Sequence, residues 1–306
     1  MRYTKYAYPI PENKIIRVIT NTDAKNEADD QFAIVQTLLT SRFENVGFIA
    51  AHFGKRRQNS MEASYAELEL IFDKMGFEKS NNIFRGASHE LENENIPVDS
   101  EGARLIINEA MKQDERPLYV TFMGAITDLA SAYLIEPRIE KRLTAIWIGG
   151  GAYPVGGSEY NLKNDIHAAN VIMKSGIELW QIPKPCYQLM SVSMAELEYK
   201  VRPYGKIGRY LFDQIVEHSQ EPGPLASAFR TGEFWSLGDN PAMGLLLFDH
   251  RFDFDWINAP EIGSNMTYIH SKLNRPIRVY NRIDPRFVLE DFFAKLFLFS
   301  KNNPEM

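Results

Sequence analysis

The chain has 306 residues, 44% of them hydrophobic, and a formal net charge of −6. This composition is typical of a globular protein with a buried core, and the mild acidity argues against a nucleic acid or an anionic membrane as partner. The single cysteine, Cys186, excludes an intramolecular disulfide and a cysteine-rich zinc site. The sequence contains neither an apolar run of about eighteen residues nor a signal-peptide pattern, so we expect a cytoplasmic protein.

Along the chain, β-branched runs alternate with segments whose apolar residues recur at helical spacing. Up to Gln181 we predict strands at Ile15–Thr20, Val46–Ala51, Leu118–Phe122, Leu143–Ile148 and Ile177–Gln181, and helices at Ala28–Leu39, Ser60–Met75, Gly102–Met111, Ile126–Leu134 and Asp165–Ser175. Further helices are predicted at Gly205–His218, Pro241–Phe248 and Pro285–Ser300, a last strand at Ile277–Tyr280, and polar loops at Glu90–Asp99 and Ser219–Pro224. The alternation predicts one doubly wound α/β domain over residues 1–306, with a mostly parallel central sheet flanked by helices.

Acidic residues follow the first predicted strand directly, at the end of the strand where open parallel sheets bind ligands. Asp23, Glu27, Asp29 and Asp30 place four carboxylates within eight residues. In one loop these groups would repel one another and raise one another's pKa values unless a cation were bound. Oxygen-only ligands suit a hard cation, Ca²⁺ or Mg²⁺, rather than zinc. In the alternative interpretation, the last three carboxylates only favour the start of the next helix through its dipole.

The third predicted strand is followed by a turn that can supply a backbone ligand. Gly124 allows the chain to turn tightly, and Thr127 or Asp128 can cap the following helix. A backbone carbonyl released in such a turn can also bind calcium. The capping role and the ligand role both remain open for this segment.

Two later segments also place polar side chains after a strand or at a helix start. The loop that begins at Gly149-Gly150-Gly151 contains Glu159 and Asn161, which are suited to vicinal hydroxyls, although Asn164 or Asp165 there can simply cap a helix. Asp239 stands at a predicted helix start, with Pro241 in the first turn. An ordinary N-cap is the alternative role for Asp239.

Together, these segments resemble the inosine–uridine-type nucleoside hydrolases from about Lys14 to the C-terminal helix. The family's opening acidic motif is matched by Asn21-Thr22-Asp23 and Asp29-Asp30, in a loop two residues longer. Its Gly-x-x-Thr turn is matched by Gly124–Thr127, its Glu-aromatic-Asn and following Asp by Glu159-Tyr160-Asn161 and Asp165, and its late calcium-binding Asp by Asp239. The order of these matches and their positions after strands make the resemblance fairly specific.

The resemblance implies the doubly wound α/β fold and hydrolysis of the N-glycosidic bond of a small ribonucleoside. It implies that Ca²⁺ is held by Asp23, Asp30, the Thr127 carbonyl and Asp239, and that Asp23 is also the general base. Asp29, Glu159 and Asn161 would bind the ribose hydroxyls. The family also suggests a homo-oligomer, either a dimer or a tetramer.

The chain departs from the family pattern mainly at the end of the site that receives the base. Asn21 replaces the first Asp of the motif, Lys55 the Asn after the second strand, Tyr153 the Asn before the Glu, and Gly238 the His that protonates the leaving group. The metal and ribose end is therefore well matched, whereas the base end is not. His52, Lys55, Tyr153, Phe234 and Trp235 either form a different base pocket or have structural roles.

Two alternatives compete with this hypothesis. Haloacid dehalogenase-type phosphatases also begin with a strand and Asp-x-Asp and carry a late Gly-Asp, here Gly238-Asp239. Their nucleophile is the first Asp, which is Asn21 here, and an amide cannot attack a phosphoryl group. The second alternative is a ribose- or nucleoside-binding protein that has kept the fold and calcium but lost catalysis.

Overall fold

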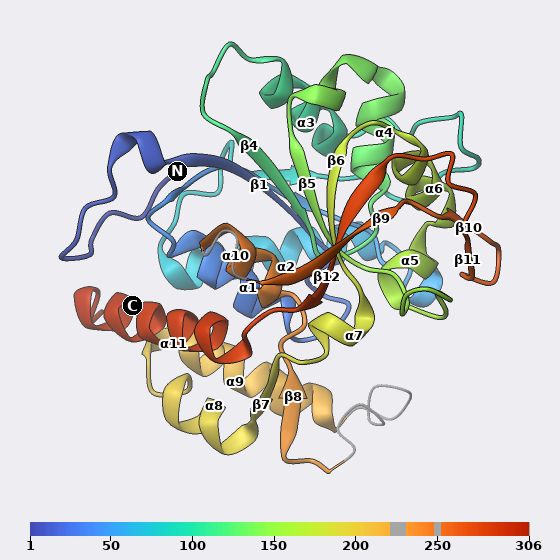
Figure 1. Cartoon of the computed structure of the whole chain (residues 1–306). Coiled ribbons are helices and arrows are strands. Elements are labelled where there is room, and N and C mark those ends of the chain that lie inside the picture. Colours follow the sequence, from blue (N-terminus) through green and yellow to red (C-terminus); the bar gives the residue numbers. More distant parts are fainter. Residues whose placement is uncertain (221–230, 248–251, 306) are drawn as a thin grey trace.

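Eight strands form the central sheet, in the order β3-β2-β1-β4-β5-β6-β12-β9 (Figure 1). The computed structural model describes residues 1–220, 231–247 and 252–305, so part of the loop predicted at Ser219–Pro224 and Phe248 of a predicted helix lie outside the described residues. All neighbouring strands are parallel except β12 and β9. The strands are β1 Ile16–Thr22, β2 Phe43–Ala50, β3 Ile83–Arg85, β4 Leu118–Phe122, β5 Thr144–Ile148, β6 Glu178–Ile182, β9 Asp253–Asn258 and β12 Pro276–Arg282.

Helices cover both faces of this sheet and enclose two hydrophobic cores (Figure 1). One core contains side chains such as Phe32, Phe72 and Phe292, and the other contains Ile106 and Leu129. The first face carries α1 Asp30–Leu38, α2 Ser60–Met75, α9 Gly205–Ser219, α10 Asn240–Leu247 and α11 Pro285–Asn302, and the second carries α3 Glu101–Met111, α4 Thr127–Ile135 and α6 Ile166–Lys174. The predicted doubly wound, mostly parallel α/β fold is thereby confirmed.

Strand β1 shows why the sequence folds in this way. All seven of its residues are buried. Val18 packs into one core and Ile19 into the other, as expected for a central strand whose successive side chains point to opposite faces. The edge strand β9 is different, because its sequence DFDWIN leaves most side chains partly or fully exposed. The predicted helix Ser60–Met75 and strand Leu118–Phe122 have the predicted bounds.

Short elements connect the layers and form a small extension beside the carboxyl ends of the strands. The structure contains η1 Glu12–Lys14, η2 Gly54–Arg56, η3 Pro137–Lys141, α5 Tyr160–Asn164, α7 Lys184–Tyr187, α8 Met194–Lys200, and the strand pairs β7 Ser191–Ser193 with β8 Phe234–Ser236 and β10 Glu261–Ile262 with β11 Tyr268–Ile269. In Figure 1, β7 and β8 lie beneath α7, next to α8 and α9. The strand order reverses between β1 and β4, and such a switch point is where open α/β sheets form a crevice for ligands.

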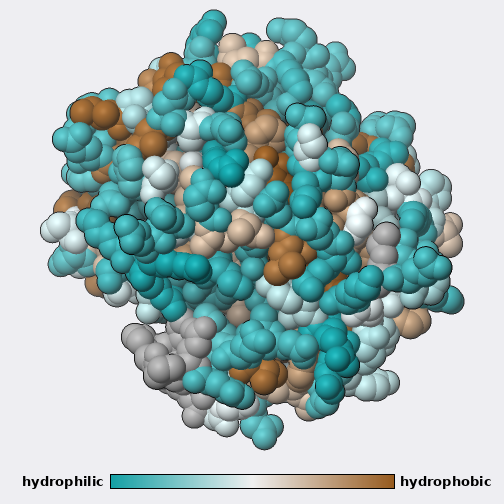
Figure 2. All heavy atoms as spheres, turned by 180° about the vertical axis from the view of Figure 1, so that it is seen from behind, coloured by the Kyte–Doolittle hydropathy of each residue, from teal (hydrophilic) through white to brown (hydrophobic). Residues whose placement is uncertain are grey.

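The surface seen in Figure 2 is mainly hydrophilic, with small and separated hydrophobic areas. Among the residues that the structure describes, no helix has the length and apolarity needed to cross a bilayer.

Candidate active site

A cavity of about 540 Å³ opens at the carboxyl ends of β1, β4, β5 and β6, close to the switch point. Residues from the small extension formed by α7, β7 and β8 close its other side. Its wall consists of Asp23, Asn26, Glu27, Asp29, Asp30, Met123, Ile148, Glu159, Tyr160, Asn161, Lys184, Tyr187, Gln188, Ser191, Phe234, Trp235, Ser236, Gly238 and Asp239. Six of these residues are carboxylic acids, which the sequence spreads from position 23 to position 239.

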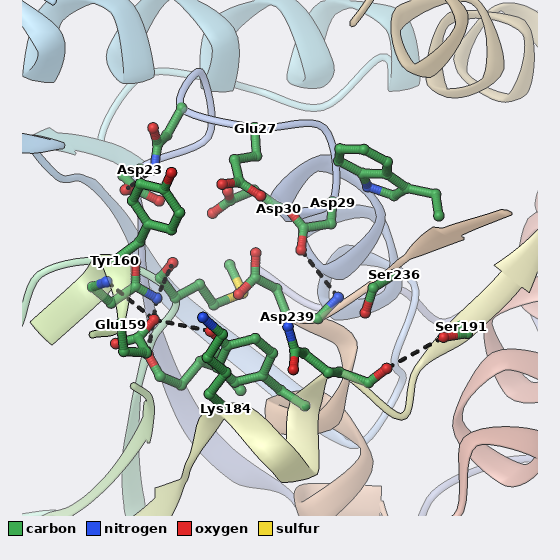
Figure 3. Close-up of a pocket in the computed structure, with 18 of the residues that line it drawn as sticks. Asp23, Glu27, Asp29, Asp30, Glu159, Tyr160, Lys184, Ser191, Ser236 and Asp239 are labelled. Atoms are coloured by element: carbon green, nitrogen blue, oxygen red, sulfur yellow. Dashed lines mark hydrogen bonds between the residues drawn. The ribbon is translucent and has the colours of Figure 1, made fainter. Parts of the chain in front are cut away.

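Three carboxylates converge inside this cavity (Figure 3). Asp29, Asp30 and Asp239 each offer an oxygen atom, and these oxygens lie within 4.8 Å of one another. The first two come from the loop and helix start after β1, and the third immediately precedes α10. Folding therefore brings together acidic groups separated by about two hundred positions, as the sequence predicted for Asp30 and Asp239. Asp29, which we had expected at the ribose hydroxyls, lies beside them.

Hydrogen bonds hold two members of this trio, Asp29 and Asp30. The Thr22 hydroxyl, at the end of β1, donates to Asp30 Oδ1. The backbone N–H of Gly238 donates to Asp29 Oδ2 at 3.0 Å and so links the two distant segments.

The electrostatics of the cavity are dominated by burial and by mutual repulsion. Burial, followed by repulsion from Asp30, raises the pKa of Asp29 to about 7. Burial raises the pKa of Asp30 to about 7 as well, with repulsion from Glu27 adding to the shift and the Thr22 hydrogen bond opposing it. The pKa values of Asp23 and Asp239 are also raised well above the ordinary range, again by burial first and then by the neighbouring carboxylates. Such a cluster is suited to binding a positive charge.

Asp23 lies on the cavity wall next to the turn that follows β4. A Cβ atom added to Gly124 would lie 2.9 Å from Asp23 Cγ, so glycine is the residue that lets this turn approach Asp23 closely. Asp23 Oδ2 accepts a hydrogen bond of 3.1 Å from the Asn26 amide. Asp23 is not one of the three carboxylates that converge within 4.8 Å, but repulsion from Asp30 adds to the rise that burial produces in its pKa.

Glu159 and Asn161 reach the cavity from the glycine-rich loop after β5, as predicted. Glu159 accepts hydrogen bonds from the backbone N–H groups of Gly150, Asn161 and Leu162, and from the Tyr187 hydroxyl at 3.0 Å. Asn161 Nδ2 donates to the carbonyls of Ile148 at 2.9 Å and Met123 at 3.3 Å. Both carbonyls engage the amide nitrogen, and Asn161 Oδ1 has no hydrogen-bond donor among the residues that the structure describes.

The turn after β4 contributes a different residue from the one that we had predicted. Thr127, proposed from the sequence as a carbonyl ligand, does not line the cavity, and its hydroxyl donates to Asp165 at 2.8 Å. His52 Nε2 lies 2.9 Å from the same hydroxyl. The residue of this turn that lines the cavity is Met123, whose carbonyl faces Asn161. Its apolar side chain gave no sign in the sequence that its carbonyl accepts a hydrogen bond from Asn161.

Of the five residues considered for a different base pocket, Phe234 and Trp235 line the cavity. His52 is buried, and burial lowers its pKa to about 4, so it is a neutral structural residue beside Thr127. Lys55 pairs with Glu90 at 2.9 Å on the surface. The Tyr153 hydroxyl donates to Gln181 at 2.7 Å, away from the cavity.

The packing around Gly238, where the family has a histidine, leaves little room for a side chain. A Cβ atom at this position would lie 3.1 Å from Tyr187 Cδ2 and 3.2 Å from Asp29 Oδ2, which is closer than most real contacts. Tyr187 therefore occupies the space next to Gly238. Lys184 and Tyr187 were not selected from the sequence alone. Both lie shortly after β6, so the expectation that ligands bind where parallel strands end applies to them too.

The fold and this cavity define the class as an α/β protein with an acidic, ligand-sized site at the switch point of a mostly parallel sheet. A family model described as inosine-uridine preferring nucleoside hydrolase matches residues 15–253. The chain belongs to this family, whose members hydrolyse N-glycosyl bonds. The membership confirms the resemblance inferred from the motifs and decides against the haloacid dehalogenase alternative.

Solved structures of nucleoside hydrolases share the fold. The purine-preferring ribonucleoside hydrolase from Gardnerella vaginalis superimposes with a TM-score of 0.77 at 17% identity, covering 94% of this chain and 99% of that chain. An inosine-guanosine nucleoside hydrolase gives a TM-score of 0.72 at 14% identity, covering 92% and 98%. The probable uridine nucleosidase 2 of Arabidopsis thaliana is 24% identical over 120 residues, which is 38% of this chain and 37% of that protein. The match thus spans little more than a third of the plant protein.

Proposed function

We propose that the protein is a calcium-dependent N-ribohydrolase that cleaves the N-glycosidic bond of ribonucleosides or of a related N-riboside. The observation that carries the proposal is the convergence of Asp29, Asp30 and Asp239 within 4.8 Å in a cavity of about 540 Å³. A cavity of this size is in the range of small-molecule sites. Family membership supports the reaction class.

The donor set fits a hard divalent cation. Ca²⁺ binds oxygen at about 2.4 Å, so two oxygens on one ion are at most about 4.8 Å apart, the limit within which this trio lies. In our proposal Asp30 and Asp239 hold the ion, with Asp23 and a strand-end carbonyl completing the protein ligands. For that carbonyl we now favour Met123 over Thr127, because Met123 lines the cavity. When bound, the ion coordinates sugar hydroxyls and eases deprotonation of the attacking water.

The residues of the chain divide the remaining tasks. Asp23, in the role of general base, accepts the proton of the attacking water. Asp29, Glu159 and Asn161 bind the ribose hydroxyls, for which Asn161 Oδ1 is an available acceptor. The carboxylates around the sugar stabilise the positive charge that develops on it in an oxocarbenium-like transition state.

The end of the cavity that we assign to the aglycone is lined by aromatic and uncharged polar side chains, in contrast to the acidic metal and ribose end. Phe234 and Trp235 provide aromatic surface, while Gln188, Ser191 and Ser236 provide polar groups. Aromatic side chains support the departing base by stacking. Gly238 cannot supply an acid, and we propose that stacking on these rings and hydrogen bonds to the polar wall assist departure.

A substrate screen tests the proposal. Purine and pyrimidine ribonucleosides and other N-ribosides are incubated with calcium, and release of reducing sugar is measured. We expect release from at least one ribonucleoside, its loss in excess chelator, and its return when calcium is restored. The matched 2′-deoxyribonucleoside should react far more slowly, because it lacks one hydroxyl that the site binds. Absence of sugar release from every compound would overturn the proposal, and tight binding without release would favour the nucleoside-binding alternative.

Calcium is expected to stabilise the fold more at about pH 8 than at about pH 5. Without metal, the pKa of Asp29 and of Asp30 is about 7 in the folded protein against an ordinary value of 3.8. The folded state therefore holds protons that the unfolded chain has lost, and stability falls as pH rises from the ordinary pKa towards 7. Bound calcium replaces those protons, so its benefit grows over the same interval.

The measurement is a set of thermal melts with chelator or with calcium at both pH values. At about 100 times its Kd, calcium adds about 2.7 kcal/mol to the free energy of unfolding. Magnesium, which requires a tighter octahedral shell, should give a smaller shift and serves as the control. Equal calcium shifts at both pH values would contradict the placement of the ion among these carboxylates.

A further inference from the structure

Asn26 and Arg56 form a hydrogen-bonded chain that ends on Asp23. The Arg56 guanidinium donates to Asn26 Oδ1 at 2.9 Å, and Asn26 Nδ2 donates to Asp23 Oδ2 at 3.1 Å. Asn26 is 6% exposed and lines the cavity, whereas Arg56 lies outside it, in η2 after β2. Two segments that follow neighbouring strands thus meet behind one carboxylate.

The direction of the two hydrogen bonds follows from the chemistry of arginine. A guanidinium group only donates hydrogen bonds, so the Asn26 carbonyl oxygen must face Arg56. The Asn26 amide hydrogens must then face Asp23, which only accepts when it is ionised. Without Arg56 the Asn26 amide can rotate by half a turn and place its oxygen against the carboxylate, where the two oxygens repel. Arg56 therefore determines that the Asn26 amide nitrogen, and not its oxygen, faces Asp23.

The loop that carries Asn26 is anchored independently of Arg56. The Asn26 N–H donates to the Asp23 carbonyl at 2.8 Å, which closes a tight turn. Lys25 pairs with Glu67 of α2 at 3.1 Å, and Tyr210 of α9 also donates to Glu67. Loss of the Arg56 side chain should therefore change the orientation of the amide without releasing the loop.

We propose that Arg56 and Asn26 are positioning residues that hold the Asp23 carboxylate in one orientation, with Oδ1 left for the proton of the attacking water. This proposal rests on the proposed function, in which Asp23 is the general base. The relay uses the loop that is two residues longer than the family motif. It assigns a role to a cavity residue, Asn26, and to an arginine that does not touch the cavity.

A second group near Arg56 requires a separate control. Glu27 lines the cavity, and the positive charge of Arg56 opposes the rise in the pKa of Glu27 that burial and Asp29 produce. Arg56 could therefore influence catalysis through Glu27 rather than through Asn26. The two routes differ in which second substitution cancels the effect of Arg56.

The first experiment measures kcat and KM for a ribonucleoside found in the screen. Arg56→Met and Asn26→Ala should each lower kcat by roughly 10- to 100-fold, the range typical of outer-shell partners, while KM changes little. Arg56→Lys, which still only donates, should recover part of the loss. Arg57→Met is the matched control, because it removes the same charge from the neighbouring position. Arg57 is exposed and has no hydrogen bond or ion pair with the described residues.

Double variants distinguish the routes. In the Asn26→Ala background, Arg56→Met should have no further effect on kcat, because residues that act through one contact are not additive. In the Glu27→Gln background, Arg56→Met should still lower kcat by the same factor. A wild-type kcat for Arg56→Met, full additivity with Asn26→Ala, or cancellation by Glu27→Gln would each overturn the relay.

Crystal structures of the wild-type protein and of Arg56→Met give a readout that does not depend on activity. The wild type should show Asn26 Nδ2 in contact with Asp23 Oδ2, and the variant should have lost that contact, with the Asp23 side chain turned. An unchanged contact in the variant would contradict the relay. If the wild type released sugar from no substrate, the proposed function would fail, while these structures would still decide whether Arg56 orients Asp23.

Discussion

Asp23→Asn is expected to lower kcat by roughly 10²- to 10⁴-fold, the contribution typical of a general base, without loss of the fold. The amide has nearly the same shape, and its oxygen can still accept the hydrogen bond from Asn26 that Asp23 accepts at 3.1 Å. It cannot accept a proton from water. Because burial and repulsion from Asp30 raise the pKa of Asp23, removing this charge should leave the melting temperature in chelator unchanged or higher.

The measurement combines steady-state rates at saturating calcium with thermal melts. Asp73→Asn is a suitable control, since Asp73 is exposed on α2 and pairs only with Lys79 among the described residues. The control should retain the wild-type kcat. A wild-type kcat for Asp23→Asn would refute the role of Asp23 as general base, and a collapsed fold would show that its role is structural.

Most of the fold could be predicted because the central strands are buried on both faces. A continuous apolar run such as that around Val18 and Ile19 has few alternatives once helical segments follow it at regular intervals. The strand β9 was missed, because its sequence DFDWIN mixes acidic and aromatic residues at an edge where neither face is fully covered. The strand β3 has only three residues, too few for a periodic pattern.

The site was predictable where its chemistry lies in side chains. Asp23, Asp30, Glu159 and Asp239 all line one cavity because each follows a strand or precedes a helix at the same edge of the sheet. Which residue of the turn after β4 lines the cavity was not predictable. Thr127 was proposed as a carbonyl ligand because it matches the family's Gly-x-x-Thr turn. Its hydroxyl donates to Asp165, and the residue of that turn that lines the cavity is Met123, whose apolar side chain gave no signal in the sequence.

Asn26 shows a further limit of sequence reasoning. In the acidic motif it is one polar residue among charged ones, and nothing in its spacing distinguishes it from a solvated loop residue. Its place on the cavity wall follows from the tight turn from Asp23, and the orientation of its amide from Arg56, thirty positions away. Tertiary contacts of this kind decide which polar residue of a loop becomes part of the site.

Asp239→Ala is expected to reduce kcat/KM by at least about 100-fold, since even outer-shell partners of a metal site contribute 10- to 100-fold. Asp239 is the member of the converging trio that lies far from the others in sequence, so its loss leaves the ion with carboxylate ligands from one segment only. Calcium affinity, measured by titration calorimetry, should fall together with kcat/KM. The exposed residue Asp213 on α9 provides the control Asp213→Ala, which should bind calcium normally.

In the absence of calcium, removing the Asp239 carboxylate should stabilise the fold. Asp239→Asn tests this with almost no change in side-chain volume. The pKa of Asp239 is raised by burial and by Asp29 and Asp30, so its ionised form opposes folding in proportion to the shift. In chelator at about pH 8 the variant should melt a few degrees above the wild type, since about 1 kcal/mol moves the Tm of a chain of this size by roughly 2 °C. At about pH 4, close to the ordinary value of 3.8, the unfolded chain also takes up much of this proton, and the difference should shrink. A carboxylate that lowers stability without calcium and is required for calcium binding has its role in binding the ion. If the variant instead melted at a lower temperature than the wild type in chelator at both pH values, the role of Asp239 would be to stabilise the helix that follows it.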